Sequence, residues 1–197
     1  MLKRSFDILL SLLLSILLLP FLLLISILIK IDSKGPILFI QGRVGRNNHD
    51  FSIMKFRTMR VQSEQKGLLT LGNHDSRITK MGYFLRRYKI DEFPQLFNIL
   101  KGDMSFVGPR PELRHYVNYY HQDDMVIFKL RPGLTGLASI KYRNEVELLK
   151  KADDPENYFI NVIIPDKLRY NKMYLNNRNF LLDLKIIALT IIKVISK

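Results

Sequence analysis

The sequence contains no cysteine, few acidic residues and only four histidines. Without cysteine the chain forms neither a disulfide framework nor a thiolate zinc site, and the histidines show no i, i+4 pairing that would bind a metal. Lysine and arginine number 31 against 18 aspartates and glutamates, which gives a formal net charge of +13 over 197 residues. Such an excess attracts polyanions, whether nucleic acid, anionic lipid headgroups or nucleotide phosphates. The length fits one domain with a modest appendage.

Charged residues are also missing from Ile8 to Ile29. This run is apolar apart from three serines and Pro20. It is long enough for a bilayer span, which takes about 20 residues, and it is not followed by the small-residue cleavage site of a signal peptide. Lys3 and Arg4 precede the run and further lysines follow it, so the flanks give no orientation signal.

Pro20 removes one helical hydrogen bond near the middle of this run and predicts a kink. Ser15, one turn earlier, is placed to hydrogen-bond a backbone group that the kink frees. A kinked helix with basic residues at both ends either dips into one leaflet and returns, or crosses the bilayer once; the residues alone favour neither. At the rim, Asp7 is expected to pair with Lys3 or Arg4, or to cap the helix start.

Two short apolar segments, Ile37–Gln41 and Phe51–Phe56, predict a hairpin with a polar loop between them. Strand alternation then puts Lys55 and Arg57 on one face. Two cations on one face suit a phosphate, although solvated charges that protect an edge strand have the same pattern. Residues 61–75 show no clear period and predict a surface loop.

A pair of carboxylates, Asp91 and Glu92, follows a predicted helix that Ser76 or Thr79 would cap and that carries Arg86 in its last turn. Asp91 is expected to be the N-cap of a second helix, Glu92–Leu100, which Gly102 would end. A capping role alone would account for an aspartate at position 91. A helix N-terminus also binds phosphate, and adjacent carboxylates are suitable ligands for Mg²⁺.

Proline fixes the backbone beside Arg110, within Gly-Pro-Arg-Pro, and beside Arg131. An arginine aimed by a rigid loop suits bidentate phosphate binding, although a structural turn with an exposed arginine is the alternative. The remaining chain predicts helices at 112–120, 145–152, 166–174 and 180–195, with a mostly extended segment at 130–142. The last helix either packs on the core or lies in the membrane interface, where Asp183 would pair with Arg4.

These motifs occur in one order: Lys3-Arg4 before the apolar run, Lys55-Phe56-Arg57-Thr58-Met59, Asp91-Glu92-Phe93-Pro94-Gln95-Leu96, Lys101-Gly102-Asp103-Met104-Ser105, Gly108-Pro109-Arg110-Pro111 and Arg131-Pro132-Gly133-Leu134-Thr135-Gly136. The series resembles the bacterial sugar transferases, the small monotopic phosphoglycosyl transferases. Each motif alone is weak, but the combination is specific and covers nearly the whole chain.

The resemblance implies transfer of a sugar-1-phosphate from a UDP-sugar to undecaprenyl (polyprenyl) phosphate, with release of UMP at the cytoplasmic face of the bacterial inner membrane. It implies that Asp91 is a covalent nucleophile, that Glu92 supports it and that Mg²⁺ is required, with both carboxylates as candidate ligands. It also favours a helix that re-enters its own leaflet at Pro20, with Lys3 and Arg4 near lipid phosphate. The family often has serine before that proline, whereas this chain has Leu19.

We therefore expect a mixed, helix-rich α/β fold in a small membrane-associated domain, with a re-entrant helix at residues 1–31 and a cytoplasmic catalytic domain at 32–197 that includes interfacial amphipathic helices. Lys55, Arg57, Arg86, Arg110 and Arg131 would hold the diphosphate. The alternatives are a membrane phosphatase that uses Asp91, and a non-catalytic basic protein bound to anionic lipid. Nucleic-acid binding is disfavoured by the membrane helix and the paired carboxylates. The terminal helices leave room for a homodimer without demanding one.

Overall fold

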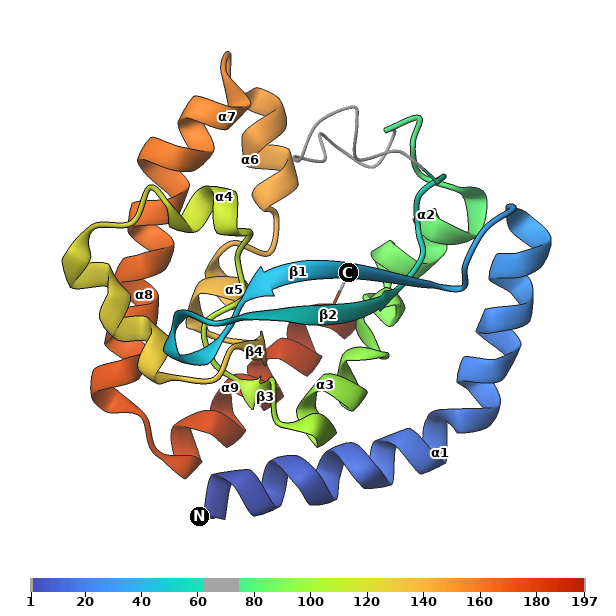
Figure 1. Cartoon of the computed structure of the whole chain (residues 1–197), viewed down its shortest axis with the longest axis horizontal. Helices are drawn as coiled ribbons and strands as arrows, with labels where there is room; N and C mark the ends of the chain where they lie inside the picture. The colour runs from blue at the N-terminus through green and yellow to red at the C-terminus, as the bar shows by residue number, and fades with distance from the viewer. Residues whose placement is uncertain (1, 62–74, 197) are drawn as a thin grey trace.

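The computed structural model describes residues 2–61 and 75–196, and within them the chain is mixed and helix-rich (Figure 1). The loop predicted at 61–75 lies mostly outside the described residues. The helices are α1 (Leu2–Asp32), α2 (Lys80–Arg87), α3 (Gln95–Lys101), α4 (Arg114–Val117), α5 (Leu137–Lys141), α6 (Glu145–Lys151), α7 (Pro155–Tyr158), α8 (Ile164–Asn177) and α9 (Phe180–Ile195). The strands are β1 (Leu38–Val44), β2 (Asp50–Phe56), β3 (Ser105–Val107) and β4 (Gly133–Thr135), and shorter helical turns are η1 (Arg46–Asn48), η3 (Ile90–Glu92), η4 (Gln122–Lys129) and η5 (Phe159–Ile163).

Helix α1 is long and apolar enough to cross a membrane. Figure 1 shows it as two arms that meet at a bend, and the proline inside it is Pro20, whose ring crowds the preceding turn. Its polarity is inverted relative to a soluble helix, because Asp7 and Ser11 are buried against the protein while most of its leucines are exposed. Such a surface suits contact with lipid. Within the described chain the hydroxyl of Ser15 has no hydrogen-bond partner, contrary to its predicted role at the kink.

The polar groups at the start of α1 bind the protein rather than one another. Asp7 accepts a hydrogen bond from the backbone N–H of Phe106 at 3.2 Å, so its predicted pairing with Lys3 or Arg4 is wrong. Arg4 donates to two carbonyls in the last turn of α3, where a cation also suits the helix dipole. Lys3 forms the ion pair with Asp183, at 2.7 Å, that had been expected for Arg4.

The predicted hairpin is confirmed. β1 and β2 pair antiparallel from Leu38 opposite Phe56 to Val44 opposite Asp50. β1 runs three residues beyond the predicted Gln41, so the connection is shorter than expected and contains η1. The second sheet pairs β3 with β4 in parallel, and the connection between them contains α4 and η4.

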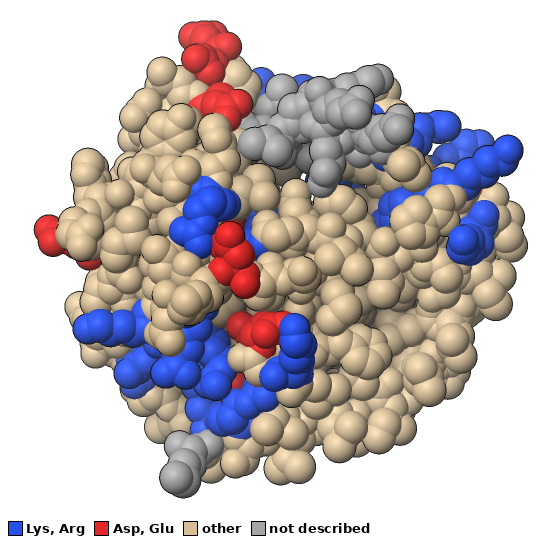
Figure 2. Space-filling view, viewed as in Figure 1, with Lys and Arg blue, Asp and Glu red and all other residues tan. Residues whose placement is uncertain are grey.

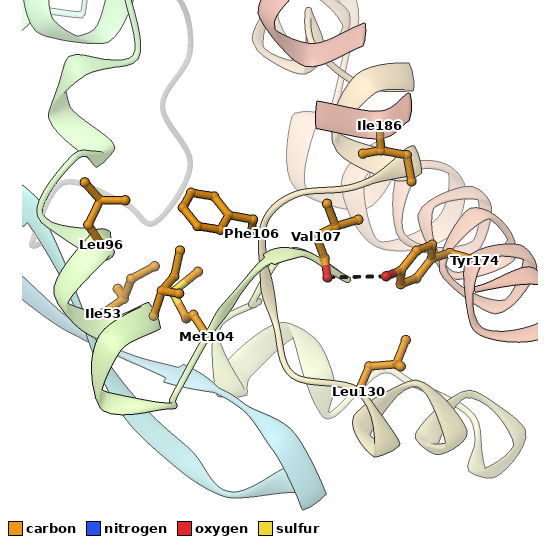
Figure 3. Close-up of a cluster of buried hydrophobic side chains, with 9 residues drawn as sticks. Ile53, Leu96, Met104, Phe106, Val107, Leu130, Tyr174 and Ile186 are labelled. Carbon is orange, nitrogen blue, oxygen red and sulfur yellow. Dashed lines mark hydrogen bonds between the residues drawn. The ribbon is translucent and has the colours of Figure 1, made fainter. Parts of the chain in front are cut away.

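The main hydrophobic core joins elements from the whole chain: β2, α3, β3, α8 and α9 (Figure 3). Figure 3 shows Val107 beside Ile186 and Tyr174, and the Tyr174 hydroxyl donates to the carbonyl of Val107. Leucines of α1 pack against the edge of this cluster. The main hydrophobic core and helix α1 are therefore one packed unit.

Several predicted boundaries hold and others change. Thr79 caps α2 through the N–H of Gly82, and Gly102 ends α3 in the left-handed region at φ 102°. The helix expected at 112–120 shrinks to the four residues of α4, whereas α8 extends on both sides of its predicted range. The segment expected to be mostly extended at 130–142 forms a strand only in β4 and then continues into α5.

The buried Asp183 carboxylate accepts hydrogen bonds from Lys3 at 2.7 Å and from Tyr174 at 2.5 Å. We expect Asp183→Ala to lower the free energy of unfolding by about 1–3 kcal/mol, because Lys3 loses its counter-ion and the buried Tyr174 hydroxyl loses its shortest hydrogen bond. Unfolding in detergent micelles, followed by circular dichroism, measures the loss. Lys185→Ala, on the exposed side of the same helix, is the control. Equal stability of the two variants would contradict the prediction.

Candidate active site

A cavity of about 1020 Å³ opens between the hairpin, α2, η3 and the C-terminal helices. Its walls differ in character. Charged side chains line one part of it, and apolar side chains of α1 and α9, including Leu10, Leu14, Ile187 and Ile191, line another part. The cavity therefore offers both an ionic region and a hydrocarbon-like region to a ligand.

Asp91 and Glu92 lie in η3, a short turn between α2 and α3. Lys89, in the left-handed region at φ 58°, directs the chain out of α2 into this turn. α3 begins only at Gln95, and its N-cap position is Pro94, so the prediction that Asp91 caps this helix is wrong. The Asp91 carboxylate is consequently free of a capping role.

Glu92 is neutralised by cations from two other segments. Arg110 donates to both of its carboxylate oxygens, at 2.5 and 3.2 Å, and Lys55 of β2 lies 3.4 Å from Oε1. Burial acts to raise the pKa of Glu92, but the positive charges of Arg110 and Lys55 outweigh it and hold that pKa well below its usual range. Glu92 is therefore a fixed anion inside an ionic cluster.

Asp91 has the opposite electrostatic balance. Burial and the adjacent negative charge of Glu92 raise the pKa of Asp91, and Lys55, Lys89 and Arg86 oppose this only in part. Its side chain is buried and lines the cavity, and no described residue donates a hydrogen bond to Oδ1. A buried carboxylate with a raised pKa at a cavity is a candidate functional group.

Arg110 is held by a tightly packed loop. The N–H of Gly108 donates to the carbonyl of Thr135, and the N–H of Gly133 donates to the carbonyl of Pro109. A Cβ on Gly108 would collide with the carbonyl oxygen of Arg131, so only glycine allows this approach. The expected aiming of Arg110 is thus explained by backbone pairing with β4 as well as by the two prolines.

The structure separates the other predicted phosphate ligands. Lys55 and Arg86 line the cavity beside Asp91. Arg57 also reaches the cavity wall, but its guanidinium donates to the carbonyls of Ser33 and Lys34 and ties β2 to the end of α1. Arg131 is not among the residues that line the cavity, and it donates instead to the carbonyl of Gly102.

An ionic chain that sequence reasoning missed extends the site from Arg110 towards α6 and α8. Lys167 lies 3.1 Å from Glu112 and 2.6 Å from Glu145, and Arg43 lies 3.9 Å from Glu112. Burial acts to lower the pKa of Lys167, but the two carboxylates raise it. The only signal in the sequence was Glu112 directly after the Gly-Pro-Arg-Pro motif; nothing marked Lys167 among the other lysines of its helix.

The fit to Mg²⁺ differs between the two carboxylates. Both oxygens of Glu92 already accept from Arg110, whereas Oδ1 of Asp91 is unpartnered among the described residues. No group of three or more acidic or histidine side chains lies together for a metal within residues 2–61 and 75–196. Mg²⁺ needs few protein ligands when substrate phosphates supply the rest. Asp91 therefore fits such an ion better than Glu92.

The comparisons with known proteins agree with one another. A family model described as "Bacterial sugar transferase" matches residues 1–197. The chain is 38% identical over 192 residues to a UDP-N-acetylgalactosamine-undecaprenyl-phosphate N-acetylgalactosaminephosphotransferase of Aeromonas hydrophila, covering 96% of this chain and 42% of that protein. It is 35% identical over 197 residues to a UDP-glucose:undecaprenyl-phosphate glucose-1-phosphate transferase of Escherichia coli K12, covering 98% and 40%.

Length distinguishes these relatives from the chain. The chain spans about two fifths of the Aeromonas and Escherichia proteins. By contrast, it covers 87% of an uncharacterized sugar transferase of Bacillus subtilis, at 35% identity over 194 residues. The similarity to the Aeromonas and Escherichia proteins therefore covers less than half of each of them.

The raised pKa of Asp91 has a consequence for stability. A carboxyl group whose pKa is higher in the folded protein than in the unfolded chain costs stability as the pH rises through that interval. We expect Asp91→Asn to raise the Tm at about pH 7 and to change it much less near the unfolded aspartate pKa of about 3.9. Thermal unfolding across this pH range measures the effect. The exposed Asp153→Asn is the control, and a Tm below that of the wild type at neutral pH would refute the prediction.

Proposed function

Because this chain belongs to the bacterial sugar transferase family, we propose that it transfers a sugar-1-phosphate from a UDP-sugar to undecaprenyl phosphate and releases UMP. The observation that carries the proposal is the unpartnered Asp91 oxygen at a cavity with cationic walls on one side and apolar walls on another. The ionic region suits a diphosphate. The apolar region, between α1 and α9, suits the start of a polyprenyl chain.

The chemistry has two steps that pass through Asp91. In the first, an oxygen of its carboxylate forms a bond to the phosphorus that bears the sugar, while the bond from that phosphorus to the bridging oxygen breaks. UMP leaves with the bridging oxygen and its electron pair. In the second, an oxygen of undecaprenyl phosphate bonds to the same phosphorus, and the bond to Asp91 breaks and restores the carboxylate. Covalent catalysis of this kind divides one difficult transfer into two.

The cations explain how one anion attacks another. Lys55, Arg86 and Arg110 lie around the reacting carboxylate and offset the charge of the diphosphate. Glu92 fixes Arg110 and Lys55 in place, so these cations need no reorganisation when the charge moves. Mg²⁺, held by Asp91 and phosphate oxygens, would add electrostatic stabilisation of the leaving group. The acceptor phosphate is already ionised, so no strong general base is needed.

The proposed placement in the membrane rests on the character of α1. We infer that residues 1–31 re-enter the cytoplasmic leaflet of the inner membrane, while residues 32–197 lie at the cytoplasmic face with α9 in the interface. Figure 2 shows lysine and arginine gathered near both ends of α1. The surface along the two arms of the helix, between these ends, is uncharged in this view. Basic residues at both ends suit two contacts with the same anionic surface. Exposed leucines and isoleucines of α9 extend the apolar surface.

The re-entrant topology makes a prediction that the cysteine-free sequence makes easy to test. Single cysteines replacing the exposed Ser5 and Lys34 should both react with a membrane-impermeant maleimide from the cytoplasmic side of sealed vesicles, because they would lie on one side. Each variant must first show wild-type expression and solubility in detergent. Labelling of the two positions from opposite sides would instead establish a single span.

The proposed reaction makes a second prediction. Purified protein with Mg²⁺, undecaprenyl phosphate and a panel of UDP-sugars should release UMP only when the lipid phosphate is present. Asp91→Asn should reduce the rate by at least about 10³-fold, because it removes the nucleophile, and the exposed Asp153→Asn should retain it.

A donor labelled in the sugar should leave acid-stable label on the protein in the absence of the lipid, and none on Asp91→Asn. UMP release that ignores the lipid would favour the hydrolase alternative. No turnover with any donor would favour a non-catalytic lipid-binding protein. Turnover without label on the protein would refute the covalent step.

A further inference from the structure

The outer edge of β2 faces α3, and Asn98 of α3 bonds to it as a neighbouring strand would. The N–H of Met54 donates to Asn98 Oδ1 at 3.0 Å, and Asn98 Nδ2 donates to the carbonyl of Ser52 at 2.8 Å. In a strand, the carbonyl of one residue and the N–H of the residue two further on point to the same edge. The carboxamide of Asn98 therefore takes the place of one peptide unit of a missing third strand.

Asn98 has little freedom to adopt another arrangement. Only 1% of its surface is exposed, so water does not readily replace its bonds. Its own carbonyl accepts hydrogen bonds from the N–H groups of Gly102, Asp103 and Met104, at 3.0–3.2 Å, where α3 ends. The residue is thus anchored in α3 through its backbone and in β2 through its side chain.

The two elements that Asn98 joins carry the two sides of the ionic cluster. Lys55 follows Met54 in β2, and its Nζ lies 3.4 Å from Glu92 Oε1. Glu92 lies in η3, which leads directly into α3. Pairing with β1 fixes the face of β2 on which Lys55 lies. The contact between Asn98 and the other edge of β2 fixes how closely that strand lies against α3, and therefore whether Lys55 reaches Glu92.

We propose that Asn98 is a positioning residue, whose carboxamide holds the free edge of β2 so that Lys55 faces Glu92 and the diphosphate that binds beside it. This role rests on the proposed transfer reaction, because Lys55 matters for rate only if the cavity binds that substrate. The competing explanation is that Asn98 supplies only stability, as any buried hydrogen-bonded residue does.

A double-mutant cycle separates the two explanations. We expect Lys55→Met to lower kcat by about 10–100-fold and Asn98→Ala to lower it by a similar factor, since a displacement of about 1 Å in a catalytic group has effects of this size. Because Asn98 acts through Lys55, the double variant should be no more than about 3-fold slower than Lys55→Met alone. Losses that multiply would overturn the proposal.

Leu149→Ala is the matched control for lost stability. Leu149 is buried in a different hydrophobic cluster, with Tyr116 and Phe159. Its effect on kcat, whatever its size, should multiply with that of Lys55→Met, since distant sites behave independently. A cycle in which Leu149→Ala couples to Lys55→Met as strongly as Asn98→Ala does would overturn the proposal, because the coupling would then report general destabilisation.

Hydrogen exchange provides a readout that does not depend on turnover. The Met54 amide should exchange at least about 10-fold faster in Asn98→Ala than in the wild type, while the β2 amides paired with β1 keep their protection. Unchanged protection of Met54 would show that Asn98 does not hold this edge. If the wild type releases no UMP but Met54 responds as expected, the proposed reaction fails and the strand-edge contact stands.

Discussion

Two adjacent carboxylates in a buried turn repel each other, and the arrangement of cations around Asp91 and Glu92 decides which of them remains available. Arg110 and Lys55 both bind Glu92, which therefore stays ionised. Asp91 keeps an unpartnered oxygen and carries the energetic cost of burial. The two carboxylates therefore have opposite electrostatic environments, which is the basis for proposing Asp91 as the nucleophile and Glu92 as its support. The hairpin, the Arg110 loop and β4 all serve to hold the cations that create this difference.

The docking of α1 obeys a related constraint. In the proposed placement, the outer surface of α1 meets lipid and the helix gains little from hydrophobic burial against protein, so polar contacts and close packing must hold it. Asp7 and Lys3 bind the two backbone groups of β3 that face them, the N–H of Phe106 and the carbonyl of Val107. Arg4 binds the end of α3. The first turns of α1 are thus connected directly to β3 and α3.

The sequence predicted correctly those features that depend on residues close together in the chain, such as turns, helix caps and helix ends. The hairpin, the Gly102 stop and α9 were predicted correctly, and Thr79 was one of the two residues expected to cap α2. Asp91 was misassigned as a cap, because a short 3₁₀ turn before Pro94 has the same residue pattern as a helix start. Its placement with Glu92, Lys55, Arg86 and Arg110 at one cavity was nevertheless anticipated.

The errors concern contacts between distant segments. Arg57 and Arg131 were predicted to bind phosphate. Instead, the Arg57 guanidinium donates to the carbonyls of Ser33 and Lys34, and Arg131 donates to the carbonyl of Gly102. No sequence pattern reveals which carbonyls a fold leaves without donors.

The contribution of Leu10 and Leu14 to the cavity has a practical consequence. Deleting α1 to obtain a water-soluble fragment would open the apolar wall of the cavity and expose the backbone of β3. Biochemical work on this protein therefore calls for the intact chain in a detergent, nanodisc or bilayer.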